Sequence, residues 1–294
     1  MYEKIDQCPI CKAKSFDNHI ICKDHSVSGE SFALSKCQEC EFVFTNPRPE
    51  KSVIQNYYDS ADYISHTDKA TNLTNIIYKQ VRNITLNQKL SLINRLTKSR
   101  TILDYGCGTG EFLNHCQTNG WEVRGVEPNG QARQISIDKN GECAVEKIED
   151  LEKEIRYDVI TLWHVLEHVH NLNKVLKKLE AKMTKKSHLV IALPNNHSFD
   201  QNLYQADWAA YDVPRHLYHF NQLTFNILAN KHGLKLIETL PMKFDAYYVS
   251  LLSEKYKTGK SNFLRAFING WKSNIWASKH NNNYSSLIYV LKKK

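Results

Sequence analysis

This 294-residue chain contains two pairs of cysteines whose spacing is typical of metal binding. Cys8 and Cys11 form one C-x-x-C pair, and Cys37 and Cys40 form the other. Four thiolates at this spacing fit a closed tetrahedral Zn²⁺ site, and metal binding would supply much of the folding energy of so small a module. Cys22 and His25 lie between the pairs and are candidates to replace one of these ligands. We expect a structural zinc-ribbon-like module rather than a catalytic metal, because a closed site has no open position.

A glycine-rich motif has the spacing of a cofactor site. In Asp104-Tyr105-Gly106-Cys107-Gly108-Thr109-Gly110, three alternate glycines follow a short apolar strand and precede a helical segment. Glycines let a ligand approach the backbone, and the helix N-terminus offers unpaired N–H groups. The dinucleotide fingerprint has the different spacing G-x-G-x-x-G. Glu127 ends the next strand and can accept both hydroxyls of a ribose.

This pattern, D-x-G-x-G-x-G followed by a strand closing on Gly-x-Glu, resembles the class I S-adenosylmethionine-dependent methyltransferases over roughly residues 85–240. The resemblance implies a doubly wound, seven-stranded, mostly parallel sheet in which the final strand inserts antiparallel. It implies that the glycines cradle the methionine moiety, that Glu127 holds the ribose and that the region of Ile148–Asp150 lies by the adenine. The cofactor-binding residues implied are Asp104, Gly106, Gly108, Gly110, Glu127, Trp163 and His164.

Histidines follow the fourth expected strand in His164-Val165-Leu166-Glu167-His168. If this stretch is helical, His164 and His168 share one face with Glu167 beside them. Such a cluster serves as a base with an orienting carboxylate, as metal ligands, or as structural histidines that cap a helix. It is similar to the E-x-x-E-H of ubiquinone-type and small-RNA methyltransferases, where the cluster can bind a divalent ion. His164 replaces the first Glu of that motif.

A second polar segment, Trp208–Phe220, resembles the D-x-P-R-H-x-x-x-F segment of small-molecule and sugar methyltransferases. Within it, His216 is our first candidate for the catalytic base. Arg215 is a candidate clamp for a carboxylate or phosphate, and Trp208 and Tyr211 are candidate walls of the acceptor pocket. The alternative is a packed loop whose His and Arg satisfy backbone carbonyls. Tyr247, further along the chain, either contacts the acceptor or packs on the core.

The elements that must position these residues alternate between strands and helices from residue 101 onward, which predicts a parallel sheet covered on both faces. Pro47 and Pro49 mark the boundary between the cysteine-containing segment and the rest of the chain.

We expect a zinc-ribbon-like module over 1–47, a helical linker or lid over 48–98 and a methyltransferase domain over 99–294. That domain carries a substrate loop (194–221) and a basic insertion (241–284). The strands expected are 101–104, 122–127, 144–148, 157–163, 188–193, 236–240 and 286–291, with helices at about 111–119, 130–140, 168–182 and 222–232.

The positive charge of the chain is concentrated near its C-terminus. From Pro241 onward there are ten Lys and Arg against two acids, which accounts for the whole net charge of +8. No apolar run approaches the ~20 residues that span a bilayer, and the first residues lack the apolar core of a signal peptide, so we expect a cytoplasmic protein.

Three functions fit these features. The first is methylation of a small molecule such as a sugar, a lipid-linked intermediate or another metabolite, since the cysteine-rich module is similar to that of sugar C-methyltransferases. The second is methylation of RNA or protein recruited by the zinc ribbon and the basic region. The third is an inactive cofactor-binding scaffold.

Overall fold

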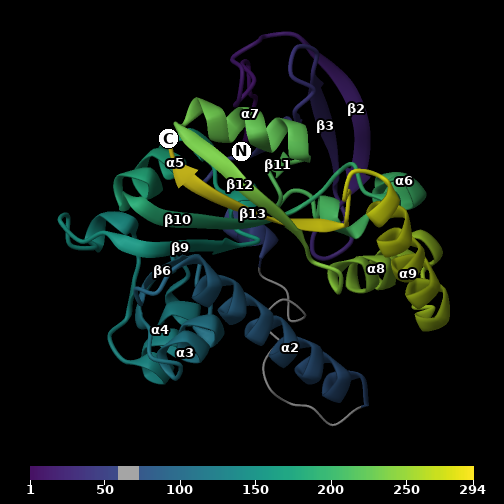
Figure 1. The fold of residues 1–294 in the computed structure, drawn as a ribbon. Helices are drawn as coiled ribbons and strands as arrows, with labels where there is room; N and C mark the ends of the chain where they lie inside the picture. Colours follow the sequence, from purple (N-terminus) through teal and green to yellow (C-terminus); the bar gives the residue numbers. More distant parts are fainter. Residues whose placement is uncertain (59–72) are drawn as a thin grey trace.

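The computed structural model describes residues 1–58 and 73–294, without the side chains of residues 73–79. Residues 59–72 of the expected helical linker therefore lie outside the described part. The chain forms a central sheet with helices on both faces and a second, smaller sheet above it (Figure 1). The central sheet has the strand order β12-β13-β10-β9-β6-β7-β8.

The seven strands of the central sheet confirm the predicted doubly wound α/β fold. Strands β8, β7, β6, β9 and β10 pair in parallel, whereas β13 is antiparallel to both β10 and β12. The antiparallel insertion implied by the family resemblance is therefore present. The strands are β6 (Thr101–Tyr105), β7 (Glu122–Val126), β8 (Ala144–Val145), β9 (Tyr157–Trp163), β10 (Met183–Pro194), β12 (Leu234–Pro241) and β13 (Ser286–Lys293).

Helices cover both faces because successive strand residues point to opposite sides. Ile102 contributes to the core beneath the sheet and Leu103 to the core above it. In Figure 1, α5 and α7 lie on one side and α2, α3 and α4 on the other. These helices are α2 (Leu73–Leu96), α3 (Glu111–Gln117), α4 (Gly130–Asn140), α5 (Leu172–Ala181) and α7 (Gln222–Lys231).

The helix expected over 168–182 starts later than predicted. Asn171 caps it by accepting a hydrogen bond from the Lys174 N–H, so α5 begins at Leu172. The preceding residues form the short 3₁₀ helix η3 (Leu166–His168), and His164 has a φ of 56°. His164 and His168 therefore do not share one face of a continuous helix, which corrects the expectation for this cluster.

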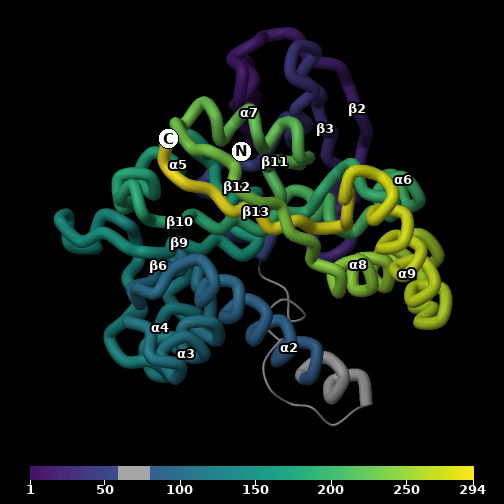
Figure 2. The backbone as a smooth tube through the Cα atoms, in the orientation of Figure 1, coloured from purple at the N-terminus to yellow at the C-terminus, as the bar shows by residue number. Residues whose placement is uncertain are grey.

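The smaller sheet joins the N-terminal segment to the expected substrate loop. Its order is β11-β4-β3-β2, and β11 comes from residues 218–219. Figure 2 shows the N-terminal chain above α7, close to the later chain that completes the sheet. The N-terminal elements are β1 (Tyr2–Glu3), β2 (Phe16–Lys23), β3 (Ser31–Cys37), β4 (Val43–Thr45), β5 (Arg48–Pro49) and η1 (Ile54–Tyr57).

The 194–221 segment also contains short helices. They are α6 (Phe199–Tyr204), η4 (Gln205–Asp207) and η5 (Ala209–Tyr211), followed by β11 (Tyr218–His219). Another short helix, η2 (Ile148–Asp150), follows β8. The expected loop is thus a compact run of short helices, in which the Ser198 side chain caps α6 and Trp208 and Tyr211 are buried.

The basic insertion forms a helical hairpin between β12 and β13, consisting of α8 (Asp245–Thr258) and α9 (Phe263–Lys279). Gly259 ends α8 with a φ of 73°, and the Asn262 side chain caps α9. The helices approach closely, because a Cβ on Gly270 would lie 2.8 Å from the Tyr247 Cα. Across the residues described, no helix has both the length and the apolar character needed to cross a membrane.

Candidate functional site

The glycine loop lies at the carboxyl end of β6, and its backbone requires glycine. Gly106, Gly108 and Gly110 have φ values of 80°, 54° and 76°, in the left-handed region. A Cβ on Gly106 would lie 2.5 Å from a methyl group of Val165, and one on Gly110 would collide with Ser136. A Cβ on Gly108 would meet no atom within 4 Å. The loop is therefore packed against protein at both ends and open at its centre, where a ligand can approach.

Glu127 faces this loop from the end of β7. Its carboxylate accepts hydrogen bonds from the Gly108 N–H at 2.9 Å and from the Asn129 N–H at 2.9 Å. Burial raises its pKa. The family resemblance assigns Glu127 to the ribose, and the structure places its carboxylate at the open centre of the loop.

Asp104 starts the motif as a buried carboxyl group. It accepts a hydrogen bond from the Thr161 hydroxyl at 2.6 Å, and burial raises its pKa to about 6. The Lys89 ammonium lies on the same side of the sheet, 4.3 Å from the ring centre of Trp163, and burial lowers its pKa. Trp163 in turn packs edge-on against Phe112 of α3. Asp104 and Trp163 thus both lie near the Lys89 ammonium, and their assignment to the cofactor stays a prediction.

Lys89 was missed by the sequence analysis. It lies on α2 between Leu86 and Leu90, both on the apolar side of that helix. A cationic residue within an apolar stripe was the signal that could have identified it.

His164 lies between two carboxylates at the end of β9. Its Nδ1 is 3.3 Å from a Glu167 oxygen, and its Nε2 is 3.1 Å from an Asp245 oxygen. Burial opposes the charge, but the hydrogen bonds to Asp245 and Glu167 outweigh it and raise the pKa of His164 to about 10. His164 is therefore an imidazolium at neutral pH, and both of its N–H groups donate to carboxylates.

His168 and His216 pack edge-to-face with ring centres 4.5 Å apart. Nδ1 of His168 is 3.0 Å from the Arg215 carbonyl, and Nδ1 of His216 is 2.8 Å from the Ala210 carbonyl. Nδ1 of His168 also lies 3.0 Å from the Tyr58 hydroxyl. A carbonyl can only accept, so Nδ1 of His216 carries the hydrogen, and Nε2 of the neutral His216 ring carries a lone pair. Burial, and then the neighbouring His216, lower the pKa of His168 to about 4.

The Nε2 side of His216 faces carboxylates. Nε2 of His216 is 4.0 Å from Glu167 Oε1 and 3.9 Å from Asp212 Oδ2. Ligand atoms of Glu167, His168 and His216 lie within 4.8 Å of one another. Glu167 is fully buried, and its Oε2 has no hydrogen-bond partner among the described residues. The cluster is therefore equipped either to take up a proton or to hold a cation.

Arg215 is enclosed by protein rather than directed into open space. Its guanidinium donates to both Asp212 oxygens, to Asp24 Oδ1 at 3.0 Å and to the Tyr57 carbonyl at 2.9 Å. Only 1% of its surface is exposed. Asp24 was missed by the sequence analysis, because nothing in its local sequence indicates a partner in the distant 212–216 segment.

The other predicted acceptor contacts are also packed in this structure. Trp208 and Tyr211 are buried and pack edge-to-face, with the Trp208 indole N–H donating to Asp200. Tyr247 stacks on Phe267 within the α8–α9 hairpin. The structure does not bring Tyr247 together with Trp208 and Tyr211 in one hydrophobic cluster. The assignment of these side chains to the acceptor stays a prediction.

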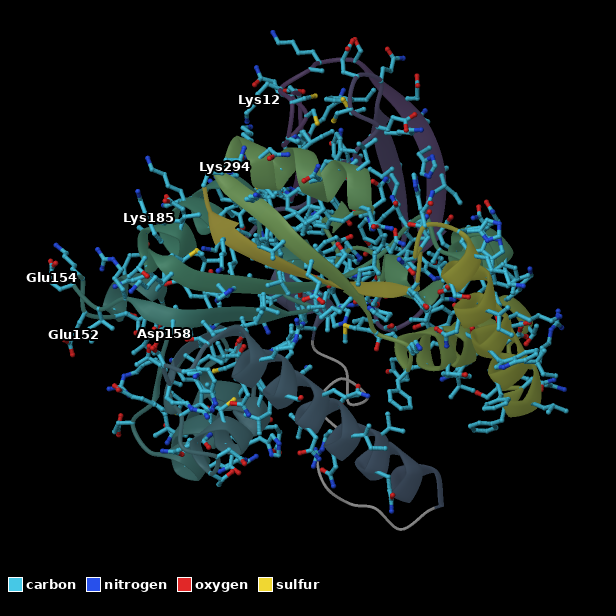
Figure 3. All side chains as sticks on the ribbon, in the orientation of Figure 1. Lys12, Glu152, Glu154, Asp158, Lys185 and Lys294 are labelled. Carbon is cyan, nitrogen blue, oxygen red and sulfur yellow. The ribbon has the colours of Figure 1, made fainter. Side chains whose placement is uncertain are left out.

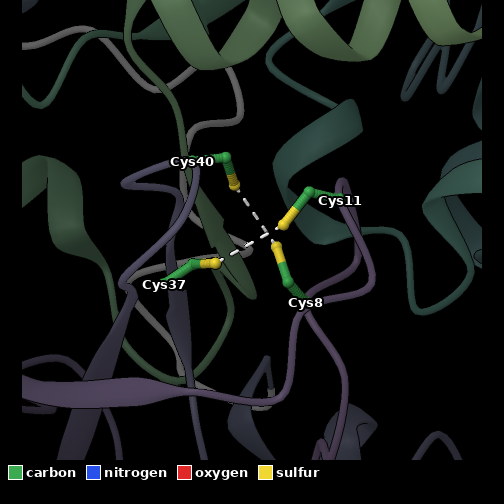
Figure 4. A group of neighbouring side chains, drawn as sticks. All are labelled: Cys8, Cys11, Cys37 and Cys40. Atoms are coloured by element: carbon green, nitrogen blue, oxygen red, sulfur yellow. Dashed lines mark hydrogen bonds between the residues drawn. The ribbon is translucent and has the colours of Figure 1, made fainter.

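The four predicted metal-binding cysteines converge (Figure 4). Sγ of Cys8 is 3.5 Å from that of Cys40, and Sγ of Cys11 is 3.5 Å from that of Cys37. Tetrahedral Zn²⁺ with Zn–S bonds of about 2.3 Å requires sulfur–sulfur separations of about 3.8 Å, so the four thiols fit this ion. Cys22 lies in a separate apolar cluster, and His25 stacks on Tyr256, so neither joins the group.

The cysteine module is attached to the rest of the protein by hydrogen bonds. The Asn173 side chain of α5 donates to the Pro9 carbonyl at 2.9 Å, and the Lys231 ammonium of α7 donates to the Ile10 carbonyl at 2.6 Å. On the far side of the module, the Thr45 hydroxyl donates to the His216 carbonyl at 2.8 Å. The module therefore contacts the backbone of the predicted base.

A family model described as a methyltransferase domain matches residues 79–239, more than half of the chain. This chain belongs to that family. The match includes the glycine loop, Glu127 and the histidine cluster, and it confirms the expected class I S-adenosylmethionine-dependent methyltransferase type. The Cys₄ module and the α8–α9 hairpin lie outside the matched residues.

The curated relatives include ubiquinone biosynthesis O-methyltransferases. That of Bradyrhizobium diazoefficiens is 26% identical over 130 residues, which cover 41% of this chain and 51% of the relative. That of Rhodopseudomonas palustris strain TIE-1 is 26% identical over 149 residues, covering 47% and 58%. The chain thus spans little more than half the length of these relatives.

Among solved structures, the magnesium protoporphyrin IX methyltransferase of Synechocystis PCC 6803, solved with bound SAH, is similar with a TM-score of 0.54. Its sequence identity to this chain is 12%, and the match covers 83% of this chain and all of that one. The same enzyme solved with bound SAM gives a TM-score of 0.50 at 13% identity, covering 85% of this chain. These similarities support the fold.

Proposed function

We propose that this protein transfers the methyl group of S-adenosylmethionine to a small polar acceptor, such as a sugar or a lipid-linked intermediate, with His216 as the base. The observation that carries the proposal is the set of contacts that the two ring nitrogens of His216 make. Its Nδ1–H is held by the Ala210 carbonyl, and its Nε2 lone pair faces two carboxylates. The ubiquinone biosynthesis O-methyltransferases among the relatives, whose name refers to a small molecule, support a small-molecule acceptor.

The cofactor would be held by the glycine loop and Glu127. Gly108 leaves open space, and Glu127 presents its carboxylate there. The family resemblance adds Trp163, which packs against Phe112 of α3. The bound cofactor supplies a methyl carbon activated by its sulfonium. What this chain adds is alignment of the acceptor and removal of its proton.

Among the three histidines, His216 is the one suited to accept that proton. His164 already carries a proton at neutral pH, and His168 has a pKa of about 4, which makes it a weak base. The neighbouring Glu167 and Asp212 carboxylates would stabilise the imidazolium formed on His216. Arg215 and Asp24 would position the loop rather than bind the acceptor, since each guanidinium nitrogen already donates to an acceptor within the protein.

A second role for the same cluster is divalent metal binding by Glu167, His168 and His216. Nδ1 of each histidine lies within hydrogen-bond distance of a backbone carbonyl, and for His216 this leaves the Nε2 lone pair on the side of Glu167, as in metal-ligating histidines. The unpartnered Glu167 Oε2 supports the same reading. Titration of the purified protein with Mn²⁺, followed by electron paramagnetic resonance, separates the roles, because a base requires no bound ion.

We also propose that Cys8, Cys11, Cys37 and Cys40 bind structural Zn²⁺, and that the chain divides into the expected parts, 1–47, 48–98 and 99–294. The sulfur geometry and the burial of three of the four cysteines support the zinc site. The N-terminal and 212–219 segments share one sheet, so the module would act together with the base-bearing loop.

An acceptor screen with methyl-labelled S-adenosylmethionine tests the proposed function. The panel contains nucleotide-linked sugars, lipid-linked intermediates, quinol precursors, bulk RNA and protein, and Gly108→Arg serves as the cofactor-site control. Transfer of label to a small acceptor by the wild type alone supports the proposal. Label found only on RNA or protein favours the macromolecular alternative, and cofactor binding without transfer to any acceptor favours the scaffold.

A further inference from the structure

Helix α9 exposes its large apolar side chains and buries its small ones. The side chains facing the protein are Ala266, Asn269, Gly270, Ser273 and Ala277. Six large apolar side chains expose between 38% and 71% of their surface, and they are Phe263, Leu264, Phe267, Ile268, Trp271 and Ile275. Burial of small residues lets α9 lie close to α8, where Gly270 meets Tyr247. The usual orientation of an amphipathic surface helix is therefore reversed.

The exposed apolar residues form one continuous stripe. At 100° per residue, these six positions lie within an arc of roughly 140°. Arg265, Lys272 and Lys279 recur every seven residues and fall together along one border of that arc. The helix thus presents an apolar face with a basic edge. Figure 1 shows helix α9 on the outer side of the hairpin, with α8 between it and the central sheet.

The hairpin has no acid that could neutralise this edge fully. Asp245 is bonded to His164, and Glu254 is buried with the Tyr204 hydroxyl and the Asn269 amide. Arg265 lies 3.3 Å from Glu254, whereas Lys272 and Lys279 have no acidic partner within ion-pair distance among the described residues. In Figure 3 the labelled acids Glu152 and Glu154 project from the opposite end of the molecule.

We propose that α9 binds the surface of an anionic lipid bilayer, with its apolar stripe in the headgroup boundary and its basic edge on the lipid phosphates. Aromatic and aliphatic side chains bordered by Lys and Arg are the composition that such interfacial helices use. A second copy of the chain is a poorer occupant, because an antiparallel two-fold pairing of α9 through this face would bring the basic edges of the two copies near each other. The helix lies on the membrane and does not cross it.

This inference is independent of the proposed function, since lipid binding needs no turnover. The two are nevertheless connected through α8, whose first residue, Asp245, is bonded to His164 in the candidate site. A hairpin on the bilayer would therefore hold the site near acceptors carried by lipid.

Sedimentation of the full-length protein with vesicles tests the proposal. The vesicles contain phosphatidylcholine alone or mixed with phosphatidylglycerol. Leu264→Ser/Trp271→Ser removes two large apolar groups from the stripe, and Lys272→Glu/Lys279→Glu reverses the basic edge. Leu223→Ser/Ile237→Ser is the matched control, because these residues are 56% and 49% exposed on α7 and β12. Equal thermal unfolding of all variants shows that each remains folded.

We expect the wild type and the matched control to bind the anionic vesicles far more strongly than the neutral ones. The apolar variant should bind about a hundredfold more weakly, at roughly tenfold for each side chain withdrawn from lipid. The charge variant should lose about tenfold or more. Failure of the wild type to bind, or equal binding by all variants, overturns the proposal. So does a wild-type dimer in lipid-free solution that Leu264→Ser/Trp271→Ser converts to a monomer, since a second copy then covers the stripe.

Discussion

The two halves of the candidate site are built in different ways. The cofactor half lies almost entirely within residues 104–127, where one strand, one loop and the next strand bring the glycines to Glu127. The acceptor half combines Asp24, the 164–168 segment, the 212–216 segment and Asp245. A contiguous site depends on local backbone geometry, whereas an assembled site depends on the packing of several distant segments. The two halves should therefore respond differently to the same disturbance.

Loss of the cysteine module should have the largest effect on methyl transfer. It should also distinguish the two halves most clearly, because only the acceptor half depends on the module. Cys8→Ser should reduce bound zinc from about one ion per chain to almost none, since such sites contribute apparent binding free energies of about 10–16 kcal/mol. Methyl transfer should be lost, because the module holds the His216 backbone and Asp24. Affinity for S-adenosylmethionine, measured by calorimetry, should change little.

Cys143→Ser is the control for this experiment, because Cys143 is a buried thiol outside the metal cluster. It should retain zinc and activity. A collapse of cofactor affinity in Cys8→Ser would show that the two halves are not independent.

His216→Gln should have the next largest effect. It removes the proposed base and should lower kcat by about 10²–10⁴-fold, the usual contribution of a positioned base. The dissociation constant for S-adenosylmethionine should stay the same, because His216 belongs to the acceptor half. Single-turnover kinetics and calorimetry measure the two quantities, with the exposed His280→Gln as control. Undiminished turnover would remove His216 as the base.

Glu127→Ala should affect the other half. It removes the carboxylate proposed to hold the ribose and should weaken cofactor binding by roughly 10- to 100-fold, as for the loss of charged hydrogen bonds. Binding of acceptor to the cofactor-free protein should not change. Glu122→Ala, an exposed acid on the same strand, is the matched control. Equal cofactor affinities of the two variants would contradict the assignment.

The smallest expected effect is the contribution of His164 to the pH dependence of the free energy of unfolding. Its pKa in the folded protein is raised from 6.5 to about 10, so the stabilisation from its ion pairs is fully present below pH 6.5 and is lost as the pH rises toward 10. The difference in free energy of unfolding between the wild type and His164→Gln should shrink over this range. Urea denaturation at several pH values measures it. A constant difference would show that His164 is not charged in the folded protein.

The sequence predicted the cofactor half and the cysteine site because both depend on local spacing. Alternate glycines with a left-handed backbone and a carboxylate at the end of the next strand are encoded within a short stretch, and the structure places Gly108 beside Glu127. Two C-x-x-C pairs likewise specify four thiols that can converge, as Cys8 and Cys40 do. The bounds of β9 were also predicted correctly, because most of its seven residues are apolar and the segment is short.

The tertiary structure alone decided what the remaining polar residues do. Arg215 has a side chain suited to an anionic ligand, but folding places Asp24 against it and uses its hydrogen bonds internally. The imidazole of His164 is a side chain that can act as a base, but its hydrogen bond to Asp245, 81 residues away, keeps it protonated. Helix α9 has a recognisable apolar pattern, yet only its packing through Gly270 shows that this pattern faces outward. Spacing along the chain fixes which groups are neighbours within one element, but partners from distant elements fix protonation, burial and orientation.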